Sequence, residues 1–316
     1  MFAIIRDGSF DSPTARLALV DTPLLSQDRV LVRVIAAGVT AMETHWLPTW
    51  KLVSGQDRRG PVTLGHEFTG EIIAVGKDVN GYNAGDRVLG HIRPYDEGAT
   101  APLVSVHPDD IIPLPHRCDP VLAATLPLAG LTAWQAMITH GDVREGQKVL
   151  IHGGAGGVGH LAIQIARWRG AHVVTTCSAD DAEFCRSLGA RETIDFGSER
   201  FEEKANDVDL VLDVVGGDVQ ERSWDVVRKG GKLITIAGEE EDAPDQERAR
   251  QQGIEAKFFI VEMNADHLGR LVELYADGVI MPVVGKRYRL ETAALAFDRG
   301  DARLRPGKSV VVLDML

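Results

Sequence analysis

The sequence predicts an α/β protein in which a doubly wound parallel sheet is inserted into a mostly-β domain. Three observations predict this fold. A glycine-rich turn joins a strand to a helix within residues 148–170, strands alternate with helices after it, and short strands between Gly, Pro and Asp turns fill the flanking regions. The expected division assigns residues 1–119 and about 265–316 to the mostly-β domain, and residues 120–264 to the parallel sheet.

The glycine-rich turn predicts a dinucleotide site. An apolar run at residues 149–151 leads into Gly154, Gly156 and Gly159, and a helical pattern follows. In such a turn the first glycine lets the chain reverse, the second lets the backbone approach a pyrophosphate, and the third lets the helix pack closely on the sheet. Free N–H groups at the helix N-terminus attract the phosphates. The expected binding residues are Gly154, Gly156, Gly157, Val158 and Gly159.

The alternating pattern continues downstream of this turn. Strands are expected at 171–177, 192–196, 208–215 and 232–237, with a helix at 180–188. Ligands bind doubly wound parallel sheets at the carboxyl ends of the strands. The residues that fall at such ends are Gly154, Ser178, Gly216 and Gly238.

The regions before and after the parallel sheet have a different character. Short strands bounded by turn residues predict a barrel-like arrangement. They are expected at 30–34, 71–76, 86–89 and 103–106, and again at 288–290 and 309–313.

Composition and charge exclude several classes of function. The net charge is −12 and no basic patch stands out, which argues against a nucleic-acid partner. The sequence shows no signal peptide and no apolar run long enough to span a membrane. Three scattered cysteines, Cys118, Cys177 and Cys185, indicate a reducing compartment. We therefore expect a cytoplasmic protein that acts on a small molecule.

Seven motifs along the chain carry a family resemblance. They lie at residues 36–40, 65–76, 85–88, 126–137, 153–159, 213–224 and 306–313. Through them the chain resembles the medium-chain dehydrogenase/reductase family, and within it the zinc-independent, quinone-oxidoreductase-like branch. The resemblance implies a Rossmann-type sheet inserted in a GroES-like barrel domain. It also implies a homodimer paired through an edge strand, which we place at 258–261.

The motif at residues 65–76 also fits zinc alcohol dehydrogenases, in which the histidine at the position of His66 binds the catalytic zinc. The two cysteine ligands of those enzymes are replaced here by Thr40 and Leu128. A catalytic zinc needs three protein ligands, so we expect no zinc. A substitute site in which Glu43 and His45 join His66 is the alternative. Without zinc, His66 is expected to be a hydrogen-bonded, semi-buried histidine, with a proton-donor role as the alternative.

The end of the second strand of the parallel sheet selects between NAD and NADP. A carboxylate there binds the ribose 2′-hydroxyl and repels a 2′-phosphate. The chain has Ser178 at this place, and a hydroxyl suits a phosphate, so NADP(H) is expected rather than NAD(H). Asp180 and Asp181 follow directly and oppose this expectation by charge.

The resemblance also implies further cofactor contacts. Thr132 would lie near the nicotinamide, Phe196 would flank the adenine, and Lys308 would reach a phosphate. The remaining expected contacts are Val215, Gly216, Ala237, Gly238 and Phe259.

The expected chemistry follows from the missing zinc. Quinones, and alkenes conjugated to a carbonyl, accept hydride without a metal Lewis acid. Residues 40–50 are a candidate wall of the substrate pocket, with Glu43, Trp46 and Trp50, and the aromatic faces suit planar apolar substrates. Thr40 and His66 are the candidate proton donors. The alternatives are a zinc-type alcohol dehydrogenase with atypical ligands and a nonenzymatic NADPH-binding protein.

Overall fold

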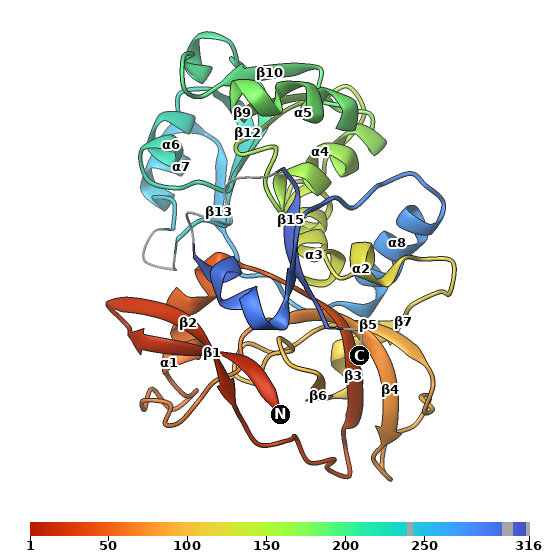
Figure 1. The fold of residues 1–316 in the computed structure, drawn as a ribbon. Coiled ribbons are helices and arrows are strands. Elements are labelled where there is room, and N and C mark those ends of the chain that lie inside the picture. Colours follow the sequence, from red (N-terminus) through yellow and green to blue (C-terminus); the bar gives the residue numbers. More distant parts are fainter. Residues whose placement is uncertain (239–242, 299–305, 314–316) are drawn as a thin grey trace. The chain divides into compact units, whose positions relative to one another are not determined.

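The computed structural model describes residues 1–238, 243–298 and 306–313. The chain forms two compact units (Figure 1). Unit 1 comprises Met1–Leu128, Met263–Asp277 and Pro282–Leu316, and unit 2 comprises Ala129–Glu262 and Gly278–Met281. Unit 2 begins at residue 129, where the sequence predicts residue 120, and its main segment ends at residue 262, where the sequence predicts residue 264.

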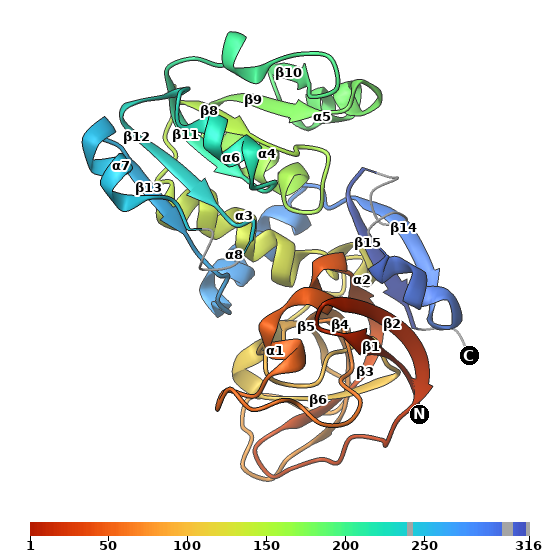
Figure 2. The ribbon, with the colours of Figure 1, turned by 90° about the vertical axis from the view of Figure 1, so that its left-hand side faces the viewer.

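Unit 2 contains a six-stranded parallel sheet with strand order β10-β9-β8-β11-β12-β13. Figure 2 shows these strands side by side. Their bounds are β8 (Lys148–Ile151), β9 (His172–Cys177), β10 (Glu192–Asp195), β11 (Val208–Asp213), β12 (Val227–Thr235) and β13 (Glu255–Phe258). The order reverses between β8 and β11, which is the switch point where doubly wound sheets bind ligands.

Helices cover this sheet because each connects two parallel strands. Helix α4 packs on β8 and β9, α5 on β9 and β10, and α6 on β11 and β12. The α-helices of unit 2 are α3 (Leu131–Trp134), α4 (Gly159–Trp168), α5 (Ala182–Leu188), α6 (Asp218–Ser223) and α7 (Gln246–Gln252). A π-helical segment (Gln135–His140) follows α3, and two 3-10 turns occur at Ala179–Asp181 and Phe201–Glu203.

Two strands of this sheet differ from the sequence prediction. β12 begins at Val227, five residues before the expected start at 232. Its first residues are polar or glycine and mostly exposed, so hydrophobic pattern could not reveal them, and pairing of Val227 with Val208 sets the start. The edge strand expected at 258–261 is β13, which ends at Phe258.

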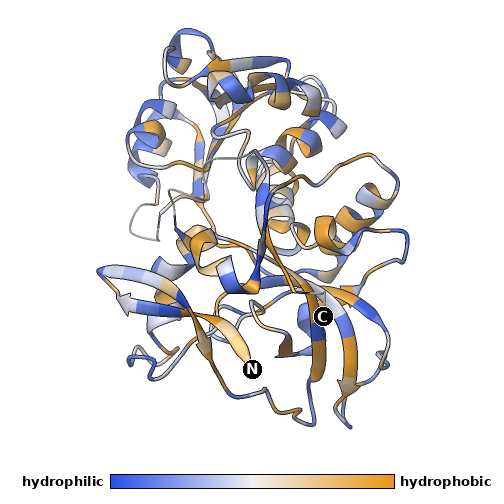
Figure 3. Cartoon of the chain, in the orientation of Figure 1, coloured by the Kyte–Doolittle hydropathy of each residue, from blue (hydrophilic) through white to orange (hydrophobic). Residues whose placement is uncertain are grey.

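Unit 1 contains a seven-stranded sheet with the path β14-β15-β3-β4-β5-β7, and β6 also pairs with β3. Their bounds are β3 (Val30–Gly38), β4 (Glu67–Val75), β5 (Arg87–His91), β6 (Leu103–Val106), β7 (Ile111–Pro113), β14 (Val284–Arg289) and β15 (Lys308–Val312). Alternate residues in the first half of β3 point into the core. Figure 3 shows both hydrophobic and hydrophilic stretches in the strands of this unit. The mostly-β pattern predicted from the sequence is confirmed.

The remaining elements of unit 1 surround this sheet. A separate hairpin pairs β1 with β2 in antiparallel register from Phe2 to Leu19. The other elements are β1 (Phe2–Ser9), β2 (Ser12–Leu19), η1 (Ala41–His45), α1 (Leu47–Trp50), η2 (Pro108–Asp110), α2 (Pro120–Ala123), η3 (Leu126–Gly130, which ends in unit 2), α8 (Ala265–Ala276) and η8 (Leu290–Phe297). β15 places Lys308 beside the end of β3, because Val310 pairs with Gly38.

Candidate functional site

The glycine-rich turn of unit 2 connects β8 to α4, as the sequence predicts. Gly153, and not Gly154, takes the left-handed conformation, with φ of 67°. Gly154 is required for a different reason, since a Cβ there would lie 2.0 Å from Thr175 Oγ1. At Gly159 a Cβ would lie 2.2 Å from the Gly153 carbonyl oxygen, so only glycine lets the helix start against the turn.

The start of α4 is suited to a phosphate group. Its N-cap residue, Val158, provides no side-chain hydrogen bond to the helix. The first amides of a helix without such a cap have no intrahelical partner and can bind an anion. Gly156 is exposed and Gly157 half-buried, so this stretch of backbone is open to solvent. The turn therefore fits the pyrophosphate of a dinucleotide, and the amides from Gly157 to Gly159 would hold it.

Ser178 and Phe196, both expected to contact the adenosine half, are brought together. Phe196 is 69% exposed, and its backbone N–H donates to the Cys177 carbonyl at 3.1 Å. The Ser178 hydroxyl, however, donates to the Asp181 carboxylate at 2.7 Å and accepts the Asp181 backbone N–H. The hydroxyl that was expected to meet a 2′-phosphate is therefore already engaged by an acidic side chain.

A buried carboxylate that the sequence analysis missed shapes the turns after β11 and β12. Asp213 is fully buried and accepts hydrogen bonds from the N–H groups of Val215 and Gly216 at 2.9 and 3.0 Å. It also accepts from the Thr235 hydroxyl, which in turn accepts from the Ala237 N–H. This network fixes Val215, Gly216 and Ala237, and Gly238 follows with φ of 87°. An acidic residue at the end of an apolar strand was the available signal.

Two expected nicotinamide contacts lie elsewhere in unit 2. Thr132 is in α3 and is 7% exposed. Phe259 follows β13 and packs its ring on His140 with centroids 4.6 Å apart. Their contacts with the cofactor stay predictions.

In unit 1 the structure joins His66 to Glu43 as a buried pair. The Glu43 carboxylate lies 2.6 Å from His66 Nδ1 and accepts the Gly65 N–H at 2.6 Å. Both side chains are at most 2% exposed. The sequence places Glu43 in the wall of the substrate pocket. The structure directs its carboxylate to His66, and a place for Glu43 in the pocket wall stays a prediction.

A second buried cluster joins Thr40, Glu67 and Lys308. The Lys308 ammonium lies 2.7 Å from the Glu67 carboxylate and donates to Thr40 Oγ1 at 3.0 Å. The other carboxylate oxygen of Glu67 accepts the Leu128 N–H at 2.9 Å. Gly38 makes room for this carboxylate, because a Cβ there would lie 2.5 Å from Glu67 Cδ.

This cluster modifies the expectations for Lys308 and adds Glu67 to the site. Lys308 is only 6% exposed and its charge is compensated by Glu67. A contact with a cofactor phosphate stays a prediction for it. Glu67 is fully buried. A buried carboxylate requires a counter-charge, so the acidic residue next to His66 was the available signal for a buried cation.

The two tryptophans of the candidate wall have different surroundings. Trp46 is half-buried and its ring lies 5.8 Å from the His66 ring, so it belongs to the buried pair's surroundings. Trp50 donates its indole N–H to the Thr44 carbonyl at 2.7 Å. It also lies under the Arg6 guanidinium. These contacts account for the position of Trp50 by packing, and its contact with a substrate stays a prediction.

Comparisons with known proteins agree with this geometry. A family described as the alcohol dehydrogenase GroES-like domain matches residues 26–116, and one described as zinc-binding dehydrogenase matches residues 188–311. NAD(P)H oxidoreductase RTN4IP1, mitochondrial, of Mus musculus is 29% identical over 87% of this chain and 76% of its own length. The 2-methylene-furan-3-one reductase of Solanum lycopersicum is 29% identical over 92% of this chain and 74% of its own length.

A solved structure decides the family. The quinone oxidoreductase from Coxiella burnetii is 32% identical, and the match covers 99% of both chains with a TM-score of 0.87. The chain belongs to the medium-chain dehydrogenase/reductase superfamily. Within the superfamily it is a member of the quinone-oxidoreductase-like branch, as its motifs predict. Membership makes it an oxidoreductase that uses a nicotinamide cofactor, and the glycine-rich turn fits the pyrophosphate of that cofactor.

The residues of this superfamily member do not fit a catalytic zinc. Across residues 1–238, 243–298 and 306–313, no three His, Cys, Asp or Glu side chains come together in a group that could hold a metal ion. In the substitute site considered above, Glu43 Oε1 is engaged by His66 and Gly65, and His45 Nδ1 interacts with the Thr44 hydroxyl. Lys308 adds a positive charge beside Glu67, which further disfavours a cation there.

The Glu43–His66 pair predicts a characteristic pH dependence. Burial opposes protonation of His66, but the charge and hydrogen bond of Glu43 outweigh it, so the pKa of His66 is raised. A raised pKa in the folded state stabilises the fold below the unfolded pKa of about 6.5, and this contribution is lost as pH rises through the folded pKa. The free energy of unfolding of the wild type minus that of His66→Asn should therefore fall as pH rises above about 6.5.

His152 provides the matched control for this measurement. Burial, together with the nearby charge of Arg222, lowers the pKa of His152 to about 3. The corresponding difference for His152→Asn should rise with pH up to about 6.5 and then stay level. Urea unfolding between pH 5 and 9 checks both trends, and a difference for His66→Asn that does not change with pH would show that the fold does not shift the pKa of His66.

Proposed function

We propose that this chain is an NADP(H)-dependent, zinc-independent oxidoreductase that transfers hydride to a quinone or to an alkene conjugated to a carbonyl. The observation that carries the proposal is the Thr40–Lys308–Glu67 cluster. Thr40 stands where zinc enzymes of the superfamily have a cysteine ligand, and it accepts a hydrogen bond from a buried ammonium. The names of the relatives, an NAD(P)H oxidoreductase and an enone reductase, support the same chemistry.

The proposed division of labour follows from the residues. The cofactor supplies the hydride, and the turn from Gly154 to Gly159 binds its phosphates. Thr40 donates a hydrogen bond to the substrate oxygen that gains negative charge as hydride is accepted. Lys308 positions Thr40: its ammonium occupies a lone pair of the hydroxyl oxygen at 3.0 Å, so the hydroxyl proton is directed elsewhere. Within the described residues no acceptor takes that proton.

His66 is the second candidate proton donor. Its Nε2 is buried, and no hydrogen bond of normal geometry to it occurs in the described chain. The raised pKa keeps a proton available on the imidazole. Trp46 beside it supplies an aromatic face for a planar substrate.

The choice of NADP(H) depends on the end of β9. No carboxylate occupies its last residue, Cys177, or the following Ser178, which favours a 2′-phosphate. Asp181 opposes this choice, since its carboxylate holds the Ser178 hydroxyl. The Ser178 hydroxyl therefore favours NADP(H), and the Asp181 carboxylate favours NAD(H).

Replacing Asp181 by asparagine is expected to strengthen NADPH binding about tenfold, with a smaller change for NADH. The substitution removes one negative charge from the proposed 2′-phosphate site and releases the Ser178 hydroxyl. Fluorescence titration of both cofactors with both proteins checks the expectation, and Asp180→Asn is the control because Asp180 makes no contact with Ser178. Equal NADPH affinities in all three proteins would remove Ser178 from the cofactor site.

The direct test of the proposed reaction is a substrate panel. Purified protein with NADPH should reduce a quinone or an enone and should not oxidise simple alcohols with NADP⁺. Tight NADPH binding without turnover of any substrate would favour a nonenzymatic NADPH-binding protein. Alcohol oxidation that requires added zinc would favour the zinc-type alternative.

The proposal extends to assembly and location. No helix in the described residues is long and apolar enough to cross a membrane. We propose a cytoplasmic homodimer without a nucleic-acid or membrane partner. The edge strand β13 of unit 2 supports the dimer, because no other strand of the described chain pairs with its outer side.

A further inference from the structure

A basic loop follows the segment that carries Thr40, Glu43 and Trp46. Residues 51, 52 and 55–59 line a solvent-open cavity of about 810 Å³ that is separate from the two buried clusters. Its lining includes three cations, Lys51, Arg58 and Arg59, and one acid, Asp57. In a chain whose net charge is −12, such a local excess of positive charge requires an explanation.

Hydrogen bonds hold the loop in a defined shape. Lys51 forms an ion pair with Asp57 across the loop, and the Leu52 N–H donates to the Gln56 carbonyl at 2.8 Å. Arg6 fastens the loop from β1, because its guanidinium donates to the Arg58 carbonyl at 2.7 Å. The cavity is therefore part of the folded unit.

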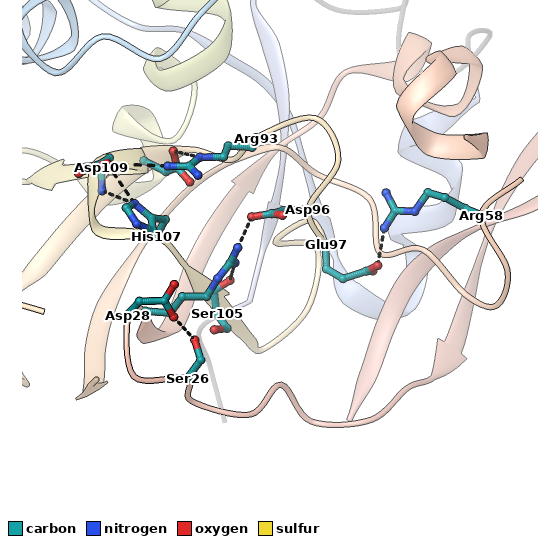
Figure 4. Close-up of polar contacts among 11 residues, drawn as sticks. Ser26, Asp28, Arg58, Arg93, Asp96, Glu97, Ser105, His107 and Asp109 are labelled. Atoms are coloured by element: carbon teal, nitrogen blue, oxygen red, sulfur yellow. Dashed lines mark hydrogen bonds and ion pairs between the residues drawn. The ribbon is translucent and has the colours of Figure 1, made fainter. Parts of the chain in front are cut away.

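The charges of the loop are not balanced. Glu97 neutralises Arg58 at 2.7 Å, as Figure 4 shows, and its other carboxylate oxygen accepts the Thr63 N–H. Asp57 is engaged by Lys51. Arg6 and Arg59 have no carboxylate of their own in the described chain.

Each of these two arginines has side-chain N–H groups that make no hydrogen bond to a carboxylate in the described residues. Arg6 donates only to carbonyl oxygens, and its buried Nε makes no hydrogen bond. Burial, and to a lesser degree the charge of Arg58, lower the pKa of Arg6, while Glu97 and Asp57 oppose the shift. Arg59 is exposed, and within residues 1–238, 243–298 and 306–313 its side chain makes no hydrogen bond or ion pair.

The loop is coupled to the candidate catalytic segment. The Arg58 N–H donates to the Trp50 carbonyl at 2.8 Å, and the Trp50 indole donates to the Thr44 carbonyl at 2.7 Å. The chain from Thr40 to Arg59 thus forms one connected segment of unit 1, with the candidate donor at one end and the arginines at the other.

We propose that the loop at residues 51–59 binds an anionic group, a carboxylate or a phosphate, carried by the substrate. The substrate class is then a conjugated alkene with a negatively charged group, and Arg59 is its principal contact. Arginine suits this role because its planar donors bind carboxylate and phosphate oxygens in pairs. The inference rests on the proposed function and narrows its substrate.

The test compares two enones of similar size, one with a free carboxylate and one with the corresponding methyl ester. In Arg59→Gln the KM for the acid should rise about tenfold while kcat stays unchanged, and the kinetics of the ester should not change. Arg289→Gln, at an exposed arginine of β14, is the control and should leave both substrates unaffected. An unchanged KM for the acid in Arg59→Gln would overturn the proposal.

A binding experiment separates this inference from the reductase proposal. With NADP⁺ at saturation, so that the glycine-rich turn is occupied, inorganic phosphate should bind the wild type in calorimetry and bind Arg59→Gln at least tenfold more weakly. At saturating NADPH it should also inhibit reduction of the acid competitively without affecting the ester. Equal binding to both proteins would contradict the anion site, whereas failure of the wild type to reduce either enone would contradict the reductase function.

Discussion

Replacing Lys308 by methionine is expected to lower the free energy of unfolding by about 3–5 kcal/mol. The substitution removes the ammonium that lies 2.7 Å from Glu67, and Glu67 is fully buried. A buried carboxylate without a counter-charge is costly, because neither water nor a cation then stabilises it. Urea unfolding of both proteins at pH 7 measures the loss.

The same sheet offers a matched control for this loss. Arg33 on β3 pairs with Glu71 on β4 at 3.1 Å, but both side chains are exposed. Arg33→Met should therefore cost no more than about 1 kcal/mol. The double variant Glu67→Gln with Lys308→Met should recover part of the loss, since it leaves no unpaired charge. A loss for Lys308→Met as small as that for Arg33→Met would show that the buried pair contributes little.

Replacing Thr40 by valine is expected to lower kcat about 100-fold, with little change in cofactor affinity. Valine keeps the shape of threonine but removes the hydroxyl that Lys308 orients at 3.0 Å. The loss should appear in kcat because the hydrogen bond strengthens as the substrate oxygen gains charge.

Thr40→Ser is the control for this substitution, since it retains the hydroxyl and should keep activity within a few-fold of the wild type. Steady-state reduction of an enone with saturating NADPH measures all three proteins. If Thr40→Val retains the wild-type kcat, Thr40 is not the donor, and the corresponding experiment with His66→Asn then decides whether His66 is.

The sequence was sufficient to predict the fold where a pattern repeats. The apolar run before Gly154 and the alternation after it predicted the parallel sheet, and the structure confirms it. The start of β12 could not be predicted, because residues 228–231 are polar or glycine and only Val227 before them pairs with β11. The left-handed turn at Gly153 was missed because the motif assigns the reversal to the next glycine.

The candidate site was less accessible to sequence analysis, because its contacts join distant residues. Lys308 and Thr40 are separated by 268 positions and meet only through the pairing of β15 with β3. The Glu43–His66 contact likewise depends on how η1 folds against the loop before β4. Residue types alone indicated that Thr40 replaces a metal ligand, but not that a lysine would lie beside it.

In the proposed reaction the Thr40–Lys308–Glu67 cluster takes the place of zinc chemistry. NADPH-dependent reduction of an enone or quinone, by protein whose zinc content is measured before and after treatment with a chelator, tests this role. Full turnover is expected at less than stoichiometric zinc, with no loss on chelation. Turnover that scales with bound zinc and disappears on chelation would rule the role out.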